Sequence, residues 1–378
     1  MTPFSMAAAE GIEPVAVARE LAARLTTPAE GEALGFLYVS DALARRLPEL
    51  LATLREATGV THWTGTVGIA LCCTGREIYD RPAAVAMLGS FPAGSARVLP
   101  PMTENDDALT ALLADWDTQD PARFALLHGD PTHGTTPAII RHLGEHTQIF
   151  GVGGIASSQG DYLSVADEVV QGAVSGVLFA ESVPVATAHT QGCTPIGPVH
   201  RITAASNNVL IQLDGRPALD VFEEDIGEVL ARDLQRAGGF IVAGLPVPGS
   251  DTRDYLVRNL VAVDTGQRLV AIGEHVREGD EILFCRRDGN AALEDLKRML
   301  ADLKRMLADL KRRAPNGARG AVYVSCLGRG RHQFGDDSQE LRIIAEELGD
   351  IPLVGFFANG EIFHNRLYGY TGVLTLFL

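Results

Sequence analysis

The chain has 378 residues, more than one hydrophobic core of average size accommodates, so two domains are expected. Its formal net charge of −16 argues against nucleic acid or an anionic membrane as a partner. Five irregularly spaced cysteines, no apolar stretch of the roughly 20 residues that span a membrane, and no signal-peptide pattern predict a cytoplasmic protein with reduced thiols.

Residues 36–81 have the pattern of a strand, an amphipathic helix and a second strand. The strand FLYVSD is followed by the helical stretch LARRLPELLATLREATG and by the apolar run VGIALCCTG. The same order returns at residues 321–366 and, more weakly, at residues 124–160. Apolar strands joined through a helix form right-handed parallel crossovers. We therefore predict a mixed α/β fold in which repeated strand–helix–strand units form mixed sheets covered by helices.

The segments between these units follow a different pattern. Residues 181–218 and 239–287 alternate apolar and polar side chains between glycine, proline and asparagine breaks, which predicts antiparallel hairpins. The stretch ALDVFEEDIGEVLARDLQRAGG, which begins at residue 218, predicts an amphipathic helix ended by glycine. We expect the domains to divide at this helix, giving an N-terminal extension at 1–34, a first domain at 35–219 and a second domain at 220–378.

Residues 295–308 repeat the heptad DLKRMLA twice in tandem. The leucines of this region step by three and four residues, which places them on one face of a helix. Two heptads are fewer than a stable coiled coil normally needs, so a packed surface helix is the expected structure. A scaffold that binds other proteins through a helix at 291–313 is an alternative role for this segment.

Two short motifs in the 124–160 unit match known sites by spacing alone. The glycines from Gly151 to Gly154 match a loose dinucleotide pattern, but a loop-like SSQGDY follows where a helix is required, so tight backbone turns explain them better. His142 and His146 match an inverted zinc-protease motif at what reads as a helix end. The sequence therefore predicts neither a metal nor a cofactor.

Cys326 is the candidate nucleophile of the chain. Arg329, Arg331 and His332 follow closely and would lower the pKa of its thiol, which favours a reactive thiolate. The 36–81 unit, however, has Asp41 at what the two sequences align as the same position, so the fold does not require a thiol there. A structural or ligand-contacting cysteine is the alternative.

Polar turns follow the second strands of the two stronger units. CTGREIYD (73–80) and ANGEIFHN (358–365) place Glu77 and Glu361 at positions that the sequence aligns as equivalent. With Arg329 or Arg331 to receive a carboxylate, such turns suit a zwitterion such as an amino acid. Capping or salt-bridge roles explain the same two glutamates equally well.

Three stretches of the chain are distinctive together: FGVGGIAS, then HTQGCTPIGPVHRIT with LDGRPALDVF, and finally GFFANGEIFHNRLYGYTGVLTLF. They resemble the FIST family, a group of bacterial small-ligand sensory modules. The resemblance runs from about residue 35 to the C-terminus and implies an intracellular sensor of a small ligand, with amino acids as candidates. It brings no catalytic residues. Because many family members are fused to output modules that this sequence does not resemble, a separate signalling partner protein is expected.

The residues predicted to bind the ligand come from the polar turns, from the ends of the first strands and from positions that match the family motifs. They are Cys73, Thr74, Glu77, Gly153, Gly154, Gln191, Cys193, Ser325, Cys326, Arg329, Arg331, Asn359, Glu361 and Asn365. The alternative function is an enzyme that acts on a small polar metabolite through Cys326 or through the Glu77 and Glu361 turns.

Overall fold

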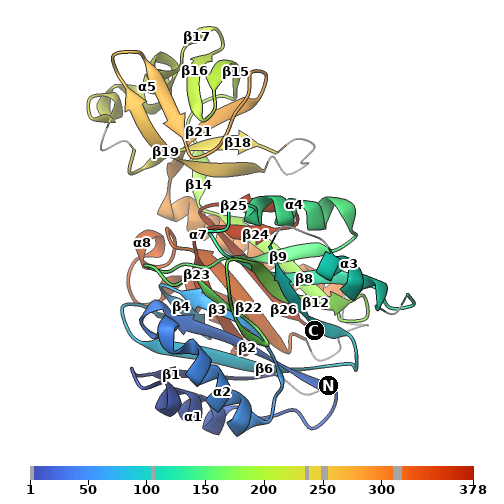
Figure 1. Cartoon of the computed structure of the whole chain (residues 1–378). Helices are drawn as coiled ribbons and strands as arrows, with labels where there is room; N and C mark the ends of the chain where they lie inside the picture. The colour runs from blue at the N-terminus through green and yellow to red at the C-terminus, as the bar shows by residue number, and fades with distance from the viewer. Residues whose placement is uncertain (1–3, 104–106, 117, 235–237, 248–253, 310–316) are drawn as a thin grey trace. The chain divides into compact units, whose positions relative to one another are not determined.

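The structure is a computed structural model that describes residues 4–103, 107–116, 118–234, 238–247, 254–309 and 317–378 (Figure 1). The chain forms two compact units: Gln191–Glu294 is one, and Met1–Thr190 together with Asp295–Leu378 is the other. We call the latter the large unit and the former the inserted unit. Residue 219, near which the sequence predicts a domain boundary, lies inside the inserted unit. Strands from both ends of the chain pair within the same sheets of the large unit, so the large unit contains residues on both sides of the inserted one.

Three strand–helix–strand units build the large unit, as predicted. They are β2 (Glu32–Ser40), α2 (Leu47–Thr58) and β3 (His62–Gly68); β8 (Ala122–Gly129), α4 (Thr136–His146) and β9 (Phe150–Ile155); and β22 (Gly320–Cys326), α9 (Gln339–Leu348) and β23 (Leu353–Ala358). In each unit the two strands are parallel neighbours. The predicted fold class is confirmed.

After its second strand, each unit sends a β-hairpin into the sheet of another unit. The hairpin β4 (Leu71–Cys73) and β5 (Arg76–Ile78) joins β23, the hairpin β24 (Glu361–Phe363) and β25 (Arg366–Tyr368) joins β9, and the hairpin β10 (Leu163–Ala166) and β11 (Glu168–Gln171) joins β3. The exchange is cyclic, so each sheet is completed by a neighbour. Backbone pairing thereby ties the three units together.

A third strand of each unit returns antiparallel to the first. These strands are β6 (Ala83–Phe91), β12 (Val174–Ala180) and β26 (Thr371–Phe377), and they carry the outer strands β1 (Ser5–Glu10), β7 (Ala96–Met102) and β13 (Val185–Gln191). The result is three six-stranded sheets. Residues expected as an N-terminal extension contribute β1 and α1 (Pro14–Arg24) to the first sheet and its cover.

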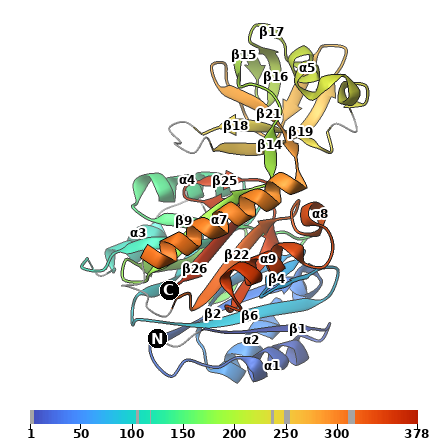
Figure 2. The same cartoon turned by 180° about the vertical axis from the view of Figure 1, so that it is seen from behind.

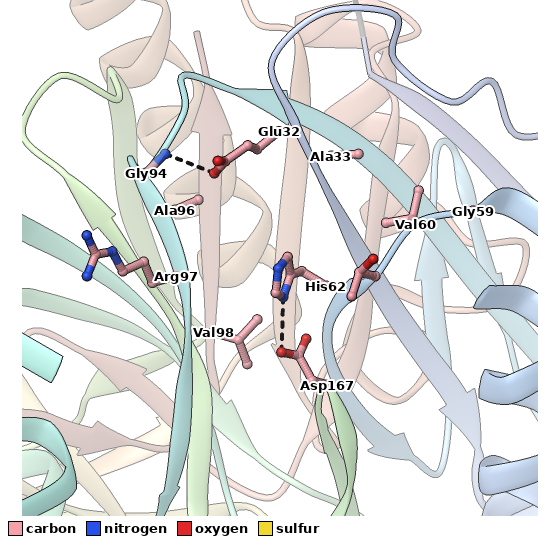
Figure 3. A pocket seen from close by; sticks show the side chains of 11 residues that line it. Glu32, Ala33, Gly59, Val60, His62, Gly94, Ala96, Arg97, Val98 and Asp167 are labelled. Atoms are coloured by element: carbon pink, nitrogen blue, oxygen red, sulfur yellow. Dashed lines mark hydrogen bonds and ion pairs between the residues drawn. The ribbon is translucent and has the colours of Figure 1, made fainter. Parts of the chain in front are cut away.

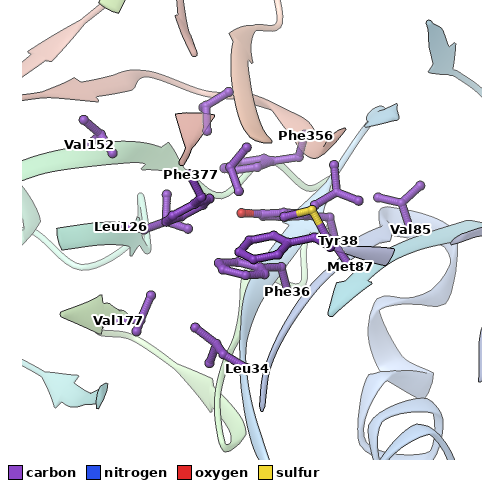
Figure 4. Packing of buried hydrophobic residues seen from close by; sticks show 14 of the residues in the cluster. Leu34, Phe36, Tyr38, Val85, Met87, Leu126, Val152, Val177, Phe356 and Phe377 are labelled. Carbon is purple, nitrogen blue, oxygen red and sulfur yellow. The ribbon is translucent and has the colours of Figure 1, made fainter. Parts of the chain in front are cut away.

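The three sheets pack their inner faces around one apolar core. Phe36 and Tyr38 of β2, Leu126 of β8, and Phe356 of β23 meet there with Phe377 at the end of β26 (Figure 4). The helices cover the outer faces: α1 and α2 on the first sheet, α3 (Asp107–Ala114) and α4 on the second, and α7 (Gly289–Asp309) and α9 on the third (Figures 1 and 2).

The duplicated heptad lies in α7, which packs on the third sheet as predicted for a surface helix. Leu296, Leu300 and Leu303 are fully buried, while Lys297 and Lys304 are exposed. None of the helices in the described ranges is long and apolar enough to cross a membrane.

A glycine recurs at the same place in the second strand of every unit. Gly65, Gly153 and Gly355 pair with Leu37, Leu127 and Tyr323, and a Cβ on any of these glycines would overlap the carbonyl oxygen of its partner. Only glycine permits this approach of two backbones. The glycine pattern near Gly151 is therefore part of a strand, β9, and no helix begins after it.

The inserted unit is an antiparallel barrel, which confirms the hairpins predicted from alternating residues. Its strands are β14 (Cys193–Pro195), β15 (His200–Ser206), β16 (Val209–Leu213), β17 (Arg216–Pro217), β18 (Ile241–Pro246), β19 (Tyr255–Asp264), β20 (Leu269–Ile272) and β21 (Glu281–Arg287). Pairing of β18 with β21 closes the sheet, and α5 (Ala218–Ala231) buries Leu219 and Phe222 against the barrel core. Gly227 adopts a left-handed conformation and interrupts α5.

Candidate functional site

A pocket of about 450 Å³ in the large unit lies between β5 with the turn that follows it and the segment 331–338. Its wall includes Glu77, Tyr79 and Asp80 on one side and Arg331 and Ser338 on the other. Two of the predicted ligand-binding residues, Glu77 and Arg331, are thus brought together from distant parts of the chain. They meet because the β4–β5 hairpin adds to β23, beside the end of β22.

Glu77 is 7% exposed and supplies the buried carboxyl group of the pocket. Its Oε2 accepts a hydrogen bond from the Tyr79 hydroxyl (2.8 Å), and its backbone N–H donates to Ser338 Oγ (2.9 Å). Oε1 has no hydrogen-bond partner among the described residues. Burial raises the pKa of Glu77 to about 7, and the charge of Glu340 also raises it. The Tyr79 hydroxyl and the backbone N–H groups of Leu341 and Glu340, at the start of α9, lower it.

Arg331 supplies the positive charge at the opposite wall. Its guanidinium lies over the Tyr79 ring, 4.3 Å from the ring centre, and its Nη1 pairs with Asp80 Oδ2 at 2.5 Å. The backbone N–H of Arg331 donates to the Tyr79 hydroxyl (3.2 Å). Its side chain is 34% exposed, so it stays within reach of a ligand from solvent.

Beneath the pocket lies a buried ion pair between Arg329 and Glu340. The Nε and Nη2 of Arg329 donate to Glu340 Oε1 (2.8 and 2.6 Å), and the Tyr323 hydroxyl donates to the same oxygen (2.6 Å). Ser325 Oγ and the Gly330 N–H donate to Oε2 (3.0 and 3.1 Å). Neither charged side chain is exposed. Arg329 is thus committed to Glu340, and of the two predicted arginines Arg331 is the one that lines the pocket.

Cys326 lies beside the buried Glu361 at the end of β22. Burial raises the pKa of the Cys326 thiol, and the charge of Glu361 raises it further; Arg329 only partly offsets this. The expected net lowering of this pKa is therefore wrong: Arg329 does lower it, but burial and Glu361 outweigh that effect. Burial likewise raises the pKa of Glu361 to about 8, although Thr371 donates to its Oε2 from Oγ1 (2.7 Å) and from the backbone (3.1 Å).

Glu77 and Glu361 do not occupy equivalent positions, contrary to the sequence alignment. Glu361 begins the first strand of its hairpin, where it pairs with Gly154. The residue at that place in the other hairpin is Leu71, which pairs with Phe356. Glu77 lies in the second strand of its hairpin. The shared Glu-Ile-aromatic sequence therefore does not mark equivalent positions in the structure.

The two Tyr-Val-Ser segments are also offset by one position. Leu37 and Tyr323 are equivalent, since each pairs with the recurrent strand glycine. Continuing along the strands, Ser40 and Cys326 come to the same place, so the alignment of Cys326 with Asp41 is wrong. A shift by one residue moves a side chain to the other face of a sheet.

Cys73 and Thr74 hold the β4–β5 hairpin in place. Thr74 Oγ1 donates to the Ile351 carbonyl (2.7 Å) and accepts from the Leu353 N–H (3.0 Å), which fixes the turn to the start of β23. Cys73 is buried in β4 opposite Val354. Neither of them lines the pocket.

Four further predicted residues lie in β9 or in the segment around β24 that pairs with it. Gly153 and Gly154 are buried strand residues that pair with β24. Asn359 donates its backbone N–H to the Ile155 carbonyl (3.0 Å), and Asn365 lies in the turn between β24 and β25. Their positions place them in the framework that joins the second and third units.

Gln191 and Cys193 belong to the inserted unit. Gln191 Nε2 donates to the Tyr255 carbonyl (2.8 Å), and the Tyr255 hydroxyl donates to the Cys193 carbonyl (2.6 Å). The pocket beside Glu77 is lined by residues of the large unit alone.

A second pocket of the large unit, of about 510 Å³, surrounds His62 (Figure 3). His62 Nδ1 pairs with Asp167 Oδ2 (3.0 Å), and Glu32 Oε2 accepts from the Gly94 N–H (2.9 Å). The side chain of His62 is 60% exposed. No lining residue of this pocket, all of which are described, has a buried polar atom without a partner, so we regard the Glu77 pocket as the better candidate.

Sequence reasoning missed Tyr79, Asp80, Ser338 and Glu340. Tyr79 and Asp80 follow Glu77 in the same polar turn, so their closeness to Glu77 in the sequence could have marked them as pocket residues. Glu340 had none, because a glutamate in the first turn of an amphipathic helix normally faces solvent.

The fold is that of a mixed α/β protein. It has three strand–helix–strand units that exchange hairpins, an inserted barrel and a polar pocket. The chain belongs to the FIST family: the FIST N domain matches residues 33–216 and the FIST C domain matches residues 218–364. FIST domains indicate a sensory or signal-transduction protein.

Two mycobacterial proteins are similar over nearly their whole length. One is "Uncharacterized protein Rv0628c" of Mycobacterium tuberculosis (strain ATCC 25618 / H37Rv), 31% identical over 367 residues, with 92% of this chain and 91% of that protein covered. The other is "Uncharacterized protein Mb0898c" of Mycobacterium bovis (strain ATCC BAA-935 / AF2122/97), 32% identical over 370 residues with the same coverage. Neither name states a ligand.

Proposed function

We propose that this FIST protein is a sensor that binds a small zwitterion, an amino acid or a close relative, in the pocket between Glu77 and Arg331. The ligand's carboxylate pairs with the Arg331 guanidinium, and its ammonium group donates to Glu77. A planar guanidinium is well suited to a carboxylate because it offers two parallel N–H donors.

The observation that carries this proposal is Oε1 of Glu77. Glu77 lines the pocket, and its Oε1 is a buried oxygen without a hydrogen-bond partner of normal geometry among the described residues. A buried polar group left unpaired costs about 1–3 kcal/mol, so a ligand that donates a hydrogen bond there gains the same order of free energy. An ammonium group is the donor that a carboxylate prefers.

The pKa of Glu77 makes the binding dependent on pH. Burial raises it to about 7 in the free protein, and an ammonium ligand binds the ionised form. Binding therefore weakens as the pH falls below about 7, because a proton then competes with the ammonium group for the same carboxylate.

The signal passes, in this proposal, to a separate partner protein in the cytoplasm. All five cysteines are free thiols, which agrees with a reducing compartment. The enzyme alternative has less support, since burial and Glu361 raise the pKa of Cys326 and so disfavour the thiolate that a nucleophile requires.

A thermal-shift screen of the twenty amino acids, their amides and the matching amines tests the proposal. A ligand that binds the native state alone stabilises it by RT ln(1 + [L]/Kd), so the melting temperature rises as the ligand concentration exceeds Kd. We expect amino acids to stabilise the protein, and amides and amines to do so less. Stabilisation by none of them at 10 mM would exclude this class of ligand.

Variants then locate the site. Glu77→Gln and Arg331→Lys should each weaken binding of the best amino acid by about tenfold, near 1.4 kcal/mol. Glu346→Gln and Arg342→Lys, the same changes on the exposed face of α9, serve as matched controls and should leave the affinity unchanged. Unchanged affinity in both pocket variants would place the ligand elsewhere.

A further inference from the structure

The arginines of the Glu77 pocket already have carboxylate partners in the free protein. Arg76 and Arg81 both pair with Glu10, which does not line the pocket. Arg331 pairs with Asp80, and both members of this pair lie on the pocket wall. An anion that enters the pocket and reaches Arg331 therefore has to compete with the Asp80 carboxylate, which is already paired with that guanidinium.

Asp80 is held in an unusual backbone conformation. Its φ of 54° lies in the left-handed region, which non-glycine residues seldom adopt, although aspartate and asparagine are the residues that tolerate it best. The side chain of Asp80 is 70% exposed, so the ion pair is open to water. Exposed pairs of this kind are weak and easily exchanged.

Arg331 has contacts that do not depend on Asp80. Its guanidinium lies over the Tyr79 ring, and its backbone N–H donates to the Tyr79 hydroxyl, which itself donates to Glu77 Oε2. Gly330 brings the backbone close to that hydroxyl, where a Cβ would overlap it. When Asp80 is released, these contacts therefore keep the guanidinium in place, and the N–H donors that faced Asp80 become available to another anion.

We propose that Asp80 is an internal occupant of the anion subsite: in the free protein its carboxylate takes the place on Arg331 that a ligand's carboxylate takes in the complex. This inference rests on the proposed function for the identity of the ligand. The competition makes Arg331 selective, because an anion must bind the guanidinium better than the tethered Asp80 does. A ligand that also binds Glu77 gains a second contact, which a simple carboxylate lacks.

Binding also changes the surface of the protein in this scheme. Asp80 loses its partner when the ligand arrives, and an unpaired carboxylate appears at the exposed turn between β5 and β6. A partner protein that recognises this turn would thereby sense the occupied pocket.

Acetate, a carboxylate without an ammonium group, tests the inference directly. Its affinity is measured by NMR from the Nε–H resonance of Arg331, assigned through its loss in Arg331→Lys, at constant ionic strength with chloride as the exchanged anion. In Asp80→Asn the affinity for acetate should rise about fivefold, the value of an exposed ion pair of up to about 1 kcal/mol. Asparagine tolerates the left-handed conformation, so the variant should fold.

Asp337→Asn is the matched control, because it removes one negative charge from the same pocket wall. It should change the acetate affinity by less than twofold. Equal affinities in the wild type and Asp80→Asn, equal gains in both variants, or no acetate-induced shift of Arg331 in any of them would each overturn the inference.

The proposed function can fail separately. If acetate binding increases in Asp80→Asn but the amino acid screen finds no ligand, the anion subsite is supported and the zwitterionic ligand is contradicted. If amino acids bind the wild type and Asp80→Asn equally well, the sensor function is supported and the role of Asp80 as an internal occupant is contradicted.

Discussion

Arg329 and Glu340 form an ion pair inside the large unit, with neither side chain exposed to solvent. Glu340 accepts five hydrogen bonds, two of them from Arg329. Removing the carboxylate charge leaves a buried guanidinium uncompensated. We expect Glu340→Gln to lower the free energy of unfolding by about 3–5 kcal/mol in urea denaturation.

Glu347→Gln is the control for this prediction. Glu347 lies in the same helix and pairs with Lys304 at the surface, where both side chains are more than 40% exposed. Its replacement should cost about 1 kcal/mol or less. Similar losses in the two variants would contradict the buried role of Glu340.

Gly153→Ala tests the close approach of β8 and β9. A Cβ at this position would overlap the Leu127 carbonyl oxygen, and the φ of 135° disfavours any side chain. We expect a loss of at least about 3 kcal/mol, seen as a lower melting temperature or as insoluble protein. Gly160→Ala, which has open space around its Cβ position, should change stability by about 0.5 kcal/mol or less.

His200 should make the inserted unit sensitive to pH. Its Nδ1 bonds to Asp214 Oδ2 (2.7 Å) and its Nε2 to Asp225 Oδ2 (2.9 Å), and only the charged imidazolium donates from both nitrogens. Gly197 makes this possible, since a Cβ there would overlap the Asp225 carboxylate. Burial lowers the pKa of His200, but the two aspartates outweigh it and raise the pKa above 6.5.

A raised pKa in the folded state gives stability that is fully present below the unfolded value and is lost as the pH rises through the folded value. Amide hydrogen exchange of residues 200–226, corrected for intrinsic rates, should therefore accelerate as the pH rises above about 6.5. His200→Gln should remove this dependence. His275→Gln, at an exposed histidine of the same unit, should keep it; identical pH profiles for the wild type and His200→Gln would contradict the prediction.

Cys326 should be slow to react in the native protein. Burial and the neighbouring Glu361 raise the pKa of its thiol, so little thiolate is present at pH 7.5. Peptide-mapped alkylation with iodoacetamide should label it at less than a tenth of the rate found in urea, and Cys326→Ser should bind the ligand as the wild type does. Rapid labelling, or a ligand adduct on Cys326, would support the enzyme alternative.

The pocket itself was only half predictable. Glu77 and Arg331 were recognisable from their chemistry and from their places at strand ends, but Arg329 looked equally suited to a ligand. Its burial depends on Glu340, a residue in the first turn of α9 that the sequence did not single out. Whether an arginine is buried in an ion pair, as Arg329 is, or lies partly exposed at a pocket, as Arg331 does, is decided by residues that share no local sequence with it.

By itself, the sequence determined the three strand–helix–strand units, the barrel hairpins and the packed heptad helix, because apolar periodicity and glycine breaks act over a few neighbouring residues. The tertiary structure alone decided which sheet each hairpin joins, the offset between Ser40 and Cys326, and the separate positions of Glu77 and Glu361. These depend on strand register and on backbone pairing between distant segments. Loops of unequal length shift register without leaving a trace in the local pattern, and one residue of shift exchanges the two faces of a strand.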